Sequence, residues 1–147
     1  MAVSNSTGQQ QGGNRPNEAL QSANPPRATI VVLDDDLLFR RGVARVLRSE
    51  RYDVIEVDDT EQLAETLRST PVDLIVADSR LSDGSDGWRE ALALARQHGH
   101  TKVLAMTGYD KDAIAAVGGF TDVEFVQKSG AGFNVVEAVE AALRSGS

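Results

Sequence analysis

The chain has 147 residues and a formal net charge of −7, and it contains no cysteine. This length suits one domain with a core of its own, and the lack of cysteine excludes disulfides, thiolate metal sites and a cysteine nucleophile. An acidic chain repels phosphate backbones, so we expect no binding to nucleic acid. The N-terminus lacks both a basic start and an apolar core, and no apolar run reaches membrane-spanning length, so we expect a cytoplasmic protein without membrane contact.

The first segment has a different composition from the rest of the chain. Residues 1–27 consist largely of Gln, Gly, Asn, Ser and Pro, as in Gln9-Gln10-Gln11-Gly12-Gly13-Asn14. Such a segment has too little apolar surface to offset the entropy lost on ordering. We therefore predict a disordered N-terminal tail over residues 1–27 and one folded domain over residues 28–147.

The folded part begins with an apolar run that predicts a buried strand, Thr29–Leu33. Three acids follow it at once, and residues 37–48 then have the spacing of an amphipathic helix. Its predicted apolar face contains Phe39, Val43, Val46 and Leu47. Its arginines are expected on a solvated face, and they are Arg40, Arg41, Arg45 and Arg48.

The same alternation of strand and helix continues to the C-terminus. Asp59 is predicted to cap the second helix, with Gln62 as its capping-box partner. The further strands are predicted over 54–57, 73–77, 102–106 and 123–126, and the further helices over about 88–97, 110–117 and 133–144. Five strands that alternate with helices indicate an α/β, doubly wound domain with a parallel sheet and right-handed crossovers.

Polar side chains stand where these strands end, at one edge of the predicted parallel sheet. They are Asp34 and Asp35 after the first strand, Asp78 after the third, Thr107 after the fourth and Lys128 after the fifth. Two carboxylates about 4 Å apart repel by about 4 kcal/mol at an effective dielectric of 20, so a cation must offset them or a proton must bind. Oxygen ligands without His or Cys favour Mg²⁺, or else Mn²⁺. Metal, lysine and a nucleophilic carboxylate are the groups that phosphoryl transfer requires.

Four strand-end segments, in this order, resemble the receiver domain of two-component response regulators. They are Val31-Val32-Leu33-Asp34-Asp35-Asp36, Asp73-Leu74-Ile75-Val76-Ala77-Asp78, Met106-Thr107-Gly108 and Phe125-Val126-Gln127-Lys128. The resemblance covers residues 28–147. It implies a five-stranded parallel sheet in the flavodoxin-like order 2-1-3-4-5 with helices on both faces.

The resemblance also implies a role for each matching residue. Asp78 would be the phosphoacceptor, taking a phosphoryl group from a phosphohistidine of a histidine kinase or histidine phosphotransfer protein. Asp34, Asp35, Asp78 and the main-chain carbonyl of Arg80 would hold Mg²⁺. Lys128 would bind a phosphoryl oxygen, and Thr107 and Phe125 would switch when Asp78 is phosphorylated, which changes the face formed by the fourth and fifth strands.

The expected output is contact with a partner protein or onward phosphoryl transfer, by a monomer or weak dimer that turns over no separate substrate. The chain departs from the family pattern at Ser129 and Ser82, where the family usually has proline, and its loop before Gly87 is one residue longer. A cis peptide bond before Ser129 would cost about 2.5–4 kcal/mol, whereas the family commonly has a cis proline there.

Other interpretations stay open at the level of sequence. The acids 34–36 also suit the cap and first turn of a helix, and Asp78 suits the start of a turn. Two further functions fit the pattern: a protein-interaction module with a receiver fold that works without phosphorylation, and a phosphohydrolase with an aspartate nucleophile. The second would carry its nucleophile on the first strand in an Asp-x-Asp-x-Thr pattern, whereas this chain reads Asp34-Asp35-Asp36-Leu37-Leu38.

Overall fold

The structure is a computed structural model, and it describes residues 25–78, 81, 86–107, 124–127 and 134–144. The elements in chain order are β2 (Thr29–Leu33), α2 (Leu37–Ser49), β3 (Asp53–Val57), α3 (Thr60–Ser69), β4 (Leu74–Asp78), α4 (Gly87–Arg96), β5 (Lys102–Thr107), β6 (Glu124–Gln127) and α6 (Val135–Arg144). Each agrees with a predicted element to within two residues at either end. The helix predicted over 110–117 lies outside the described residues.

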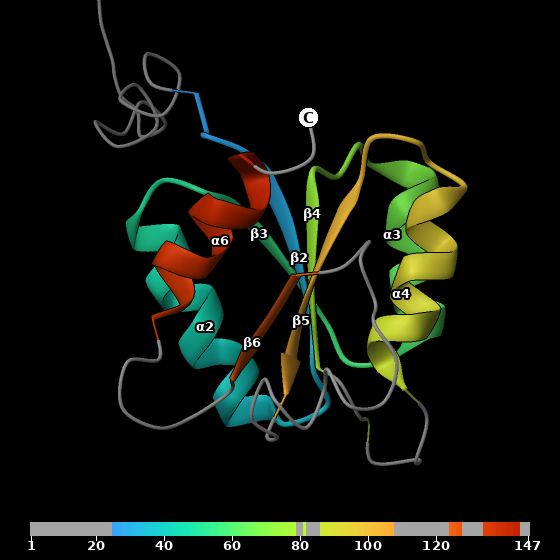
Figure 1. The fold of residues 1–147 in the computed structure, drawn as a ribbon, viewed down its shortest axis with the longest axis horizontal. Coiled ribbons are helices and arrows are strands. Elements are labelled where there is room, and N and C mark those ends of the chain that lie inside the picture. Colours follow the sequence, from blue (N-terminus) through green and yellow to red (C-terminus); the bar gives the residue numbers. More distant parts are fainter. Residues whose placement is uncertain (1–24, 79–80, 82–85, 108–123, 128–133, 145–147) are drawn as a thin grey trace, which may run out of the picture.

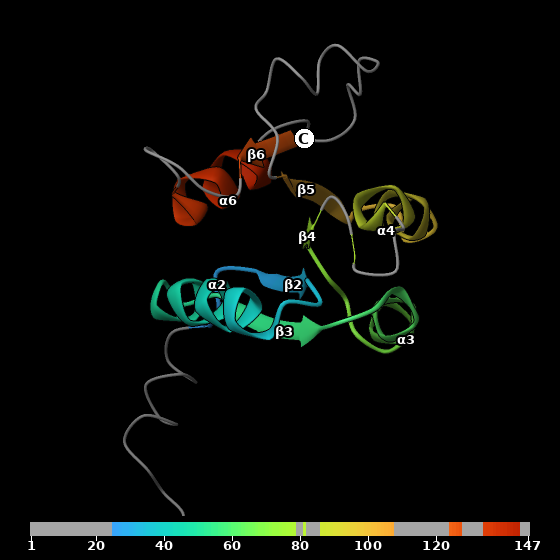
Figure 2. The same cartoon turned by 90° about the horizontal axis from the view of Figure 1, so that it is seen from below.

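The five strands form one parallel sheet in the order β3-β2-β4-β5-β6, which is 2-1-3-4-5 when strands are counted along the chain. The predicted fold is therefore confirmed. Figure 2 looks along the sheet and shows the strands in this order, with β4 in the middle and β2 beside it. The order reverses direction between these two strands, and ligand sites of open α/β sheets lie beyond the carboxyl ends of the strands at such a point.

Helices cover both faces of the sheet. In Figure 1, α2 and α6 lie on one side and α3 and α4 on the other. Successive residues of a strand point to opposite faces, and in β2 the residues Ile30 and Val32 pack toward α2 and α6, whereas Val31 and Leu33 pack toward α3 and α4. Burial on both faces explains why β2 and β4 are continuous apolar runs rather than alternating ones.

The first helix illustrates what the sequence pattern predicted well and where it failed. Val43, Ala44 and Leu47 are its buried residues, and Phe39 is partly buried against the same core. Val46, predicted on the apolar face, is exposed. The buried stripe is centred between Val43 and Leu47. Because an α-helix has 3.6 residues per turn, Val46 lies at the rim of this stripe.

The opposite end of the sheet is closed by contacts of Arg27. Its guanidinium donates a hydrogen bond to Glu140 Oε2 at 3.0 Å, and it lies 4.6 Å from the centre of the Tyr52 ring. Its main-chain N–H donates to the carbonyl of Arg51. Thus Arg27 already belongs to the packed part of the chain and joins the α2–β3 turn to α6. Among the described residues, no helix is long and apolar enough to cross a lipid bilayer.

Candidate functional site

Three of the predicted acids come together at the carboxyl edge of the sheet. Asp34, Asp35 and Asp78 each place one carboxylate oxygen so that these atoms lie within 4.8 Å of one another. The strand register produces this, because Leu33 of β2 pairs with Ala77 of β4, and Asp34 and Asp78 come directly after these paired residues. Asp34 and Asp78 are buried and Asp35 is half-buried. The structure therefore places the acids together in a mostly dry location.

Hydrogen bonds hold the main chain of Asp34 and one of its carboxylate oxygens. Its N–H donates to the carbonyl of Val57 on β3 at 3.2 Å, and its Oδ1 accepts from the N–H of Asp36 at 2.9 Å. Its carbonyl accepts from Nη1 of Arg40 at 2.8 Å. These bonds fix both the position and the direction of the carboxylate.

The third acid of the run has a different role. Asp36 is the N-cap of α2, and its Oδ1 accepts from the N–H groups of Leu38 and Phe39 at 3.1 and 3.2 Å. Such a cap is worth about 1 kcal/mol of helix stability. The capping interpretation of the acidic run thus holds for Asp36, whereas Asp34 and Asp35 belong to the acid cluster.

The start of α4 packs directly against the end of β4. A side chain on Gly87 would place its Cβ 2.6 Å from the carbonyl oxygen of Asp78, which is closer than such atoms approach one another, and 3.2 Å from Cγ of Leu81, which is a tight contact. The next residue, Trp88, is buried against the core. A glycine at this position therefore lets the helix approach the strand end that carries Asp78.

The remaining predicted site residues are only partly covered by the described residues. Thr107 is the buried last residue of β5, and its neighbour Met106 pairs with Asp78. Phe125 lies in β6, opposite Ala105. Lys128 follows directly after the last residue of β6, but Lys128 and Arg80 lie outside the described residues. Four predicted residues thus stand at one edge, namely Asp34, Asp35, Asp78 and Thr107.

The donor set suits a hard divalent cation. All three groups are carboxylates, the ligands that Mg²⁺ prefers, and Mg²⁺ binds oxygen at about 2.0–2.1 Å, so oxygens on opposite sides of the ion are about 4 Å apart. Carboxylate oxygens that lie within 4.8 Å of one another are close to that spacing. The residues present therefore fit Mg²⁺, which also explains how three acids can share one location.

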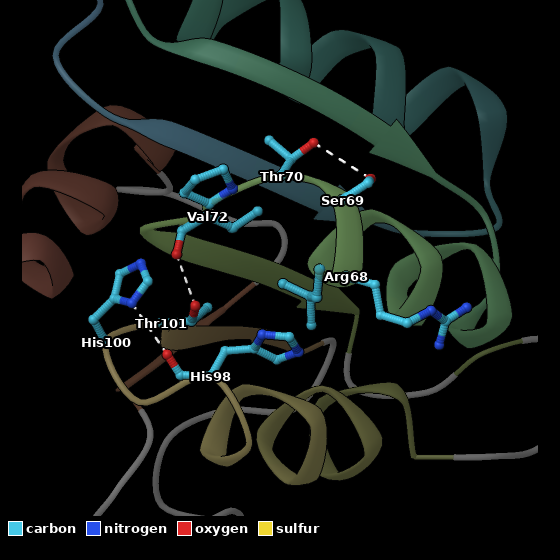
Figure 3. A pocket seen from close by; sticks show the side chains of 9 residues that line it. Arg68, Ser69, Thr70, Val72, His98, His100 and Thr101 are labelled. Carbon is cyan, nitrogen blue, oxygen red and sulfur yellow. Dashed lines mark hydrogen bonds between the residues drawn. The ribbon is translucent and has the colours of Figure 1, made fainter.

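A groove lies at the opposite edge of the sheet from the acid cluster. This groove of about 270 Å³ lies between the end of α3 and the α4–β5 connection, and both histidines of the chain, His98 and His100, line it. Figure 3 shows Nδ1 of His100 directed at the carbonyl of His98, 3.1 Å away, and Thr101 bonded to Val72. Among the described residues, the aspartates form the one group of three or more metal-ligating side chains, so the histidines do not join a metal cluster there.

One residue of the site was missed at the level of sequence. Arg40 was predicted on a solvated face, but its side chain is only 13 % exposed and bonds both Asp34 and Glu56. The prediction for Arg40 was therefore wrong, whereas Arg41 and Arg45 are exposed as predicted. The usable signal was the short distance in sequence between Arg40 and the acids. A residue in the first turns of a helix can reach back to the end of the strand that precedes it.

Comparison with known proteins agrees with this geometry. A family model described as the response regulator receiver domain matches residues 30–140. The chain therefore belongs to the receiver domain family of response regulators. Receiver domains are signalling domains that generally bind Mg²⁺ through acidic residues and interact with histidine kinases or phosphotransfer proteins.

Individual relatives support the same assignment. A probable transcriptional regulatory protein NarL of Mycobacterium tuberculosis is 31% identical over 116 residues, which cover 78% of this chain and 50% of that protein. The chain thus spans about half the length of that curated relative. The solved receiver domain of the M. tuberculosis NarL has a TM-score of 0.66 at 30% identity, covering 82% of this chain and 99% of the other. The receiver domain of the hybrid histidine kinase CckA has a TM-score of 0.59 at 27% identity, covering 79% and 99%.

Proposed function

We propose that this chain accepts a phosphoryl group on Asp78 from a phosphohistidine of a histidine kinase or histidine phosphotransfer protein. The observation that carries the proposal is the convergence of Asp34, Asp35 and Asp78 within 4.8 Å at the strand edge where Thr107 also ends. A receiver fold supplies the context in which this cluster has a chemical purpose.

The proposed step is a displacement at phosphorus. A carboxylate oxygen of Asp78 forms a bond to phosphorus while the P–N bond of the phosphohistidine breaks, and the electron pair of that bond returns to the imidazole nitrogen. The products are an aspartyl phosphate and a histidine. The imidazole of that histidine exchanges a proton with solvent, so that one of its two nitrogens is protonated and the ring is neutral. Bound Mg²⁺ would supply positive charge to the phosphoryl oxygens.

The neighbouring residues have supporting roles in this proposal. Asp34 and Asp35 hold the cation, Mg²⁺ or Mn²⁺, with Asp78 and the carbonyl of Arg80, and Lys128 binds a phosphoryl oxygen. The hydroxyl of Thr107 donates a hydrogen bond to the phosphoryl group after transfer, and Phe125 turns with it. This rearrangement changes the β5–β6 face, which then contacts a partner protein or passes the phosphoryl group on.

The rest of the chain has a simpler proposed organisation. Residues 1–27 precede the receiver domain of residues 28–147 as a tail whose last residue, Arg27, packs against the domain. The domain acts as a monomer or weak dimer. The domain promotes its own phosphorylation and dephosphorylation and has no separate substrate. The whole chain has a formal charge of −7 and does not itself bind nucleic acid.

The test uses a small phosphodonor, phosphoramidate, with Mg²⁺, and intact-mass measurement of the protein. We expect the wild type and Asp73→Asn to gain one phosphoryl group and Asp78→Asn to gain none. Asp73 is a matched control because it precedes the strand that Asp78 ends. Labelling that persists in Asp78→Asn would overturn the assignment of the acceptor.

Two other outcomes separate the competing functions. A folded wild type that gains no phosphoryl group, from phosphoramidate or from any histidine kinase in a phosphotransfer panel, would favour the interaction module that works without phosphorylation. Steady turnover of a generic phosphate ester would favour the phosphohydrolase.

A further inference from the structure

Arg40 connects the acid cluster to the edge strand of the sheet. From the second turn of α2, its Nη1 donates to the carbonyl of Asp34 at 2.8 Å, and its Nε donates to Oε1 of Glu56 at 3.3 Å. Glu56 lies on β3, opposite Val32 of β2. One guanidinium therefore joins the residue that follows β2 to a carboxylate on the neighbouring strand.

The chain also holds a natural comparison for this arginine. Arg48, two turns further along α2, bonds the other oxygen of Glu56 at 3.2 Å and the carbonyl of Val54 at 2.8 Å. Its side chain is 50% exposed, whereas those of Arg40 and Glu56 are 13% and 20% exposed. Both arginines thus bond Glu56 and a main-chain carbonyl, but only the carbonyl bonded by Arg40 belongs to a residue of the acid cluster.

We propose that Arg40 is a positioning residue for the metal-binding acids and that Glu56 holds it in place. The proposal rests on the proposed function, because it concerns binding of Mg²⁺ by Asp34 and its neighbours. A planar guanidinium donates hydrogen bonds to a carbonyl and a carboxylate in fixed directions, whereas an ammonium group has no such planar set of donors. With its N–H bonded to Val57 and its carbonyl to Arg40, Asp34 is fixed at both ends of its main chain.

Positioning and charge have opposite consequences for Mg²⁺, so the two can be separated. A cationic side chain near the acids repels Mg²⁺, and its removal would tighten binding if charge alone mattered. Loss of positioning would weaken binding instead. Removal of a residue that orients a metal ligand typically weakens metal affinity by about 10–100-fold, and we infer that this effect prevails at Arg40.

The experiment measures Mg²⁺ affinity by isothermal titration calorimetry at a temperature where all variants are folded. Arg40→Gln removes the charge, and Arg40→Lys keeps the charge but lacks the planar guanidinium that donates to two partners. Arg48→Gln is the matched control, because it loses an ion pair to Glu56 outside the acid cluster. We expect both Arg40 variants to bind Mg²⁺ about tenfold more weakly than wild type, and Arg48→Gln to stay within about twofold.

Two further measurements make the result independent of folding losses. Hydrogen exchange at the N–H of Asp36, which bonds Oδ1 of Asp34, should accelerate in the Arg40 variants and not in Arg48→Gln. Should Arg40→Gln fail to fold, Glu56→Gln removes the charged anchor of Arg40 and should weaken Mg²⁺ binding in the same direction.

The outcomes distinguish this proposal from the one on which it rests. A wild type that binds no Mg²⁺ would overturn the proposed function and this inference with it. If the wild type binds Mg²⁺ and the Arg40 variants bind it with the same affinity as Arg48→Gln, only the inference about Arg40 would be overturned. Tighter binding by Arg40→Gln, with Arg40→Lys unchanged, would show that Arg40 acts through its charge and would also overturn it.

Discussion

Strand β4 has an aspartate at each end, and the two differ in what surrounds them. Asp73, just before the strand, has a carboxylate that accepts from the N–H of Thr29 at 2.8 Å. Its N–H donates to the carbonyl of Thr29, and its carbonyl accepts from Lys102. Asp73 therefore ties the starts of three strands together. Asp78, the last residue of the strand, instead brings its carboxylate within 4.8 Å of those of Asp34 and Asp35.

The difference shows how position in a parallel sheet decides what an acid does. The first residues of parallel strands have N–H groups that need acceptors, so an acid there is stabilised by the main chain. At the other edge, neighbouring strand ends bring side chains of the same sign together, and their repulsion must be offset by a cation or a proton. The carboxylates at the carboxyl edge therefore still require a cation or a proton, whereas the carboxylate of Asp73 at the amino edge accepts a hydrogen bond within the fold.

The largest expected effect is that of Mg²⁺ on thermal stability. A ligand at a hundredfold excess over its Kd stabilises the folded state by about 2.7 kcal/mol. We expect that gain in wild type and in Asp73→Asn, and less than half of it in Asp78→Asn, because only Asp78 belongs to the acid cluster. Differential scanning calorimetry with and without Mg²⁺ measures it. Equal gains in the two variants would remove the distinction between the ends of β4.

The next effect is that of replacing glycine by alanine at two helix positions, one crowded and one open. Gly87→Ala should lower the free energy of unfolding by about 1–3 kcal/mol, because its Cβ would lie 2.6 Å from the carbonyl oxygen of Asp78. Gly42→Ala is the matched control, since nothing lies within 4 Å of a Cβ at Gly42 in α2, and it should raise stability by about 0.5–1 kcal/mol. Urea unfolding measures both.

A destabilised Gly87→Ala should also accept phosphate more slowly, because the clash moves the strand end that carries Asp78. Unchanged stability in Gly87→Ala would show that the start of α4 can withdraw from β4 without penalty. The comparison with Gly42 excludes a general effect of alanine on helices.

Most of the fold followed from the sequence because its signals were local. The buried strands are short apolar runs bounded by turn residues, and helix starts such as that capped by Asp59 carry acceptor side chains at the right spacing. The cap of α3 also shows a limit: Gln62 was predicted to complete the capping box, and its Oε1 accepts from the N–H of Asp58 instead of that of Asp59. The element was right although this bond was not.

The candidate site followed from the sequence only in part, for a physical reason. Asp34 and Asp78 were found because parallel topology brings strand ends to one edge, which needs no knowledge of side-chain packing. The role of Arg40 was missed because it depends on a pair of contacts, to Asp34 and to Glu56, between elements whose relative placement the pattern does not give. The same limit applies to Asp73, whose partner Thr29 is distant in sequence.

An effect of similar size is expected at the amino edge itself. Asp73→Ala leaves the N–H of Thr29 without its carboxylate partner, and a partly buried donor that loses its partner costs about 1–3 kcal/mol. We expect Asp73→Asn to cost less, because an amide oxygen can still accept the bond. Chemical denaturation of the three proteins measures this, and equal losses in both variants would show that the charge of Asp73 rather than its hydrogen bond matters.

The smallest effect is the alkaline pH dependence of the contacts around Tyr52. Burial raises the pKa of Tyr52 above its usual value of 10.0, although the guanidinium of Arg27 above the ring acts in the opposite direction. A raised pKa in the folded state means that the folded protein holds this proton more tightly than the unfolded chain. The stabilisation is therefore complete below pH 10.0 and is lost as the pH rises through the folded value.

Tyr52→Phe has no proton to lose, so the stability of wild type should fall relative to that of Tyr52→Phe as the pH rises above about 10. Lysines also titrate in this range, but they do so in both proteins, and the difference between the two urea-unfolding curves isolates Tyr52. Arg27→Gln should steepen the decline, because removing this cation takes away the main opposing influence on burial, which raises the pKa of Tyr52. Parallel pH profiles for wild type and Tyr52→Phe would mean that the hydroxyl at the amino edge is as well hydrated in the folded protein as in the unfolded chain.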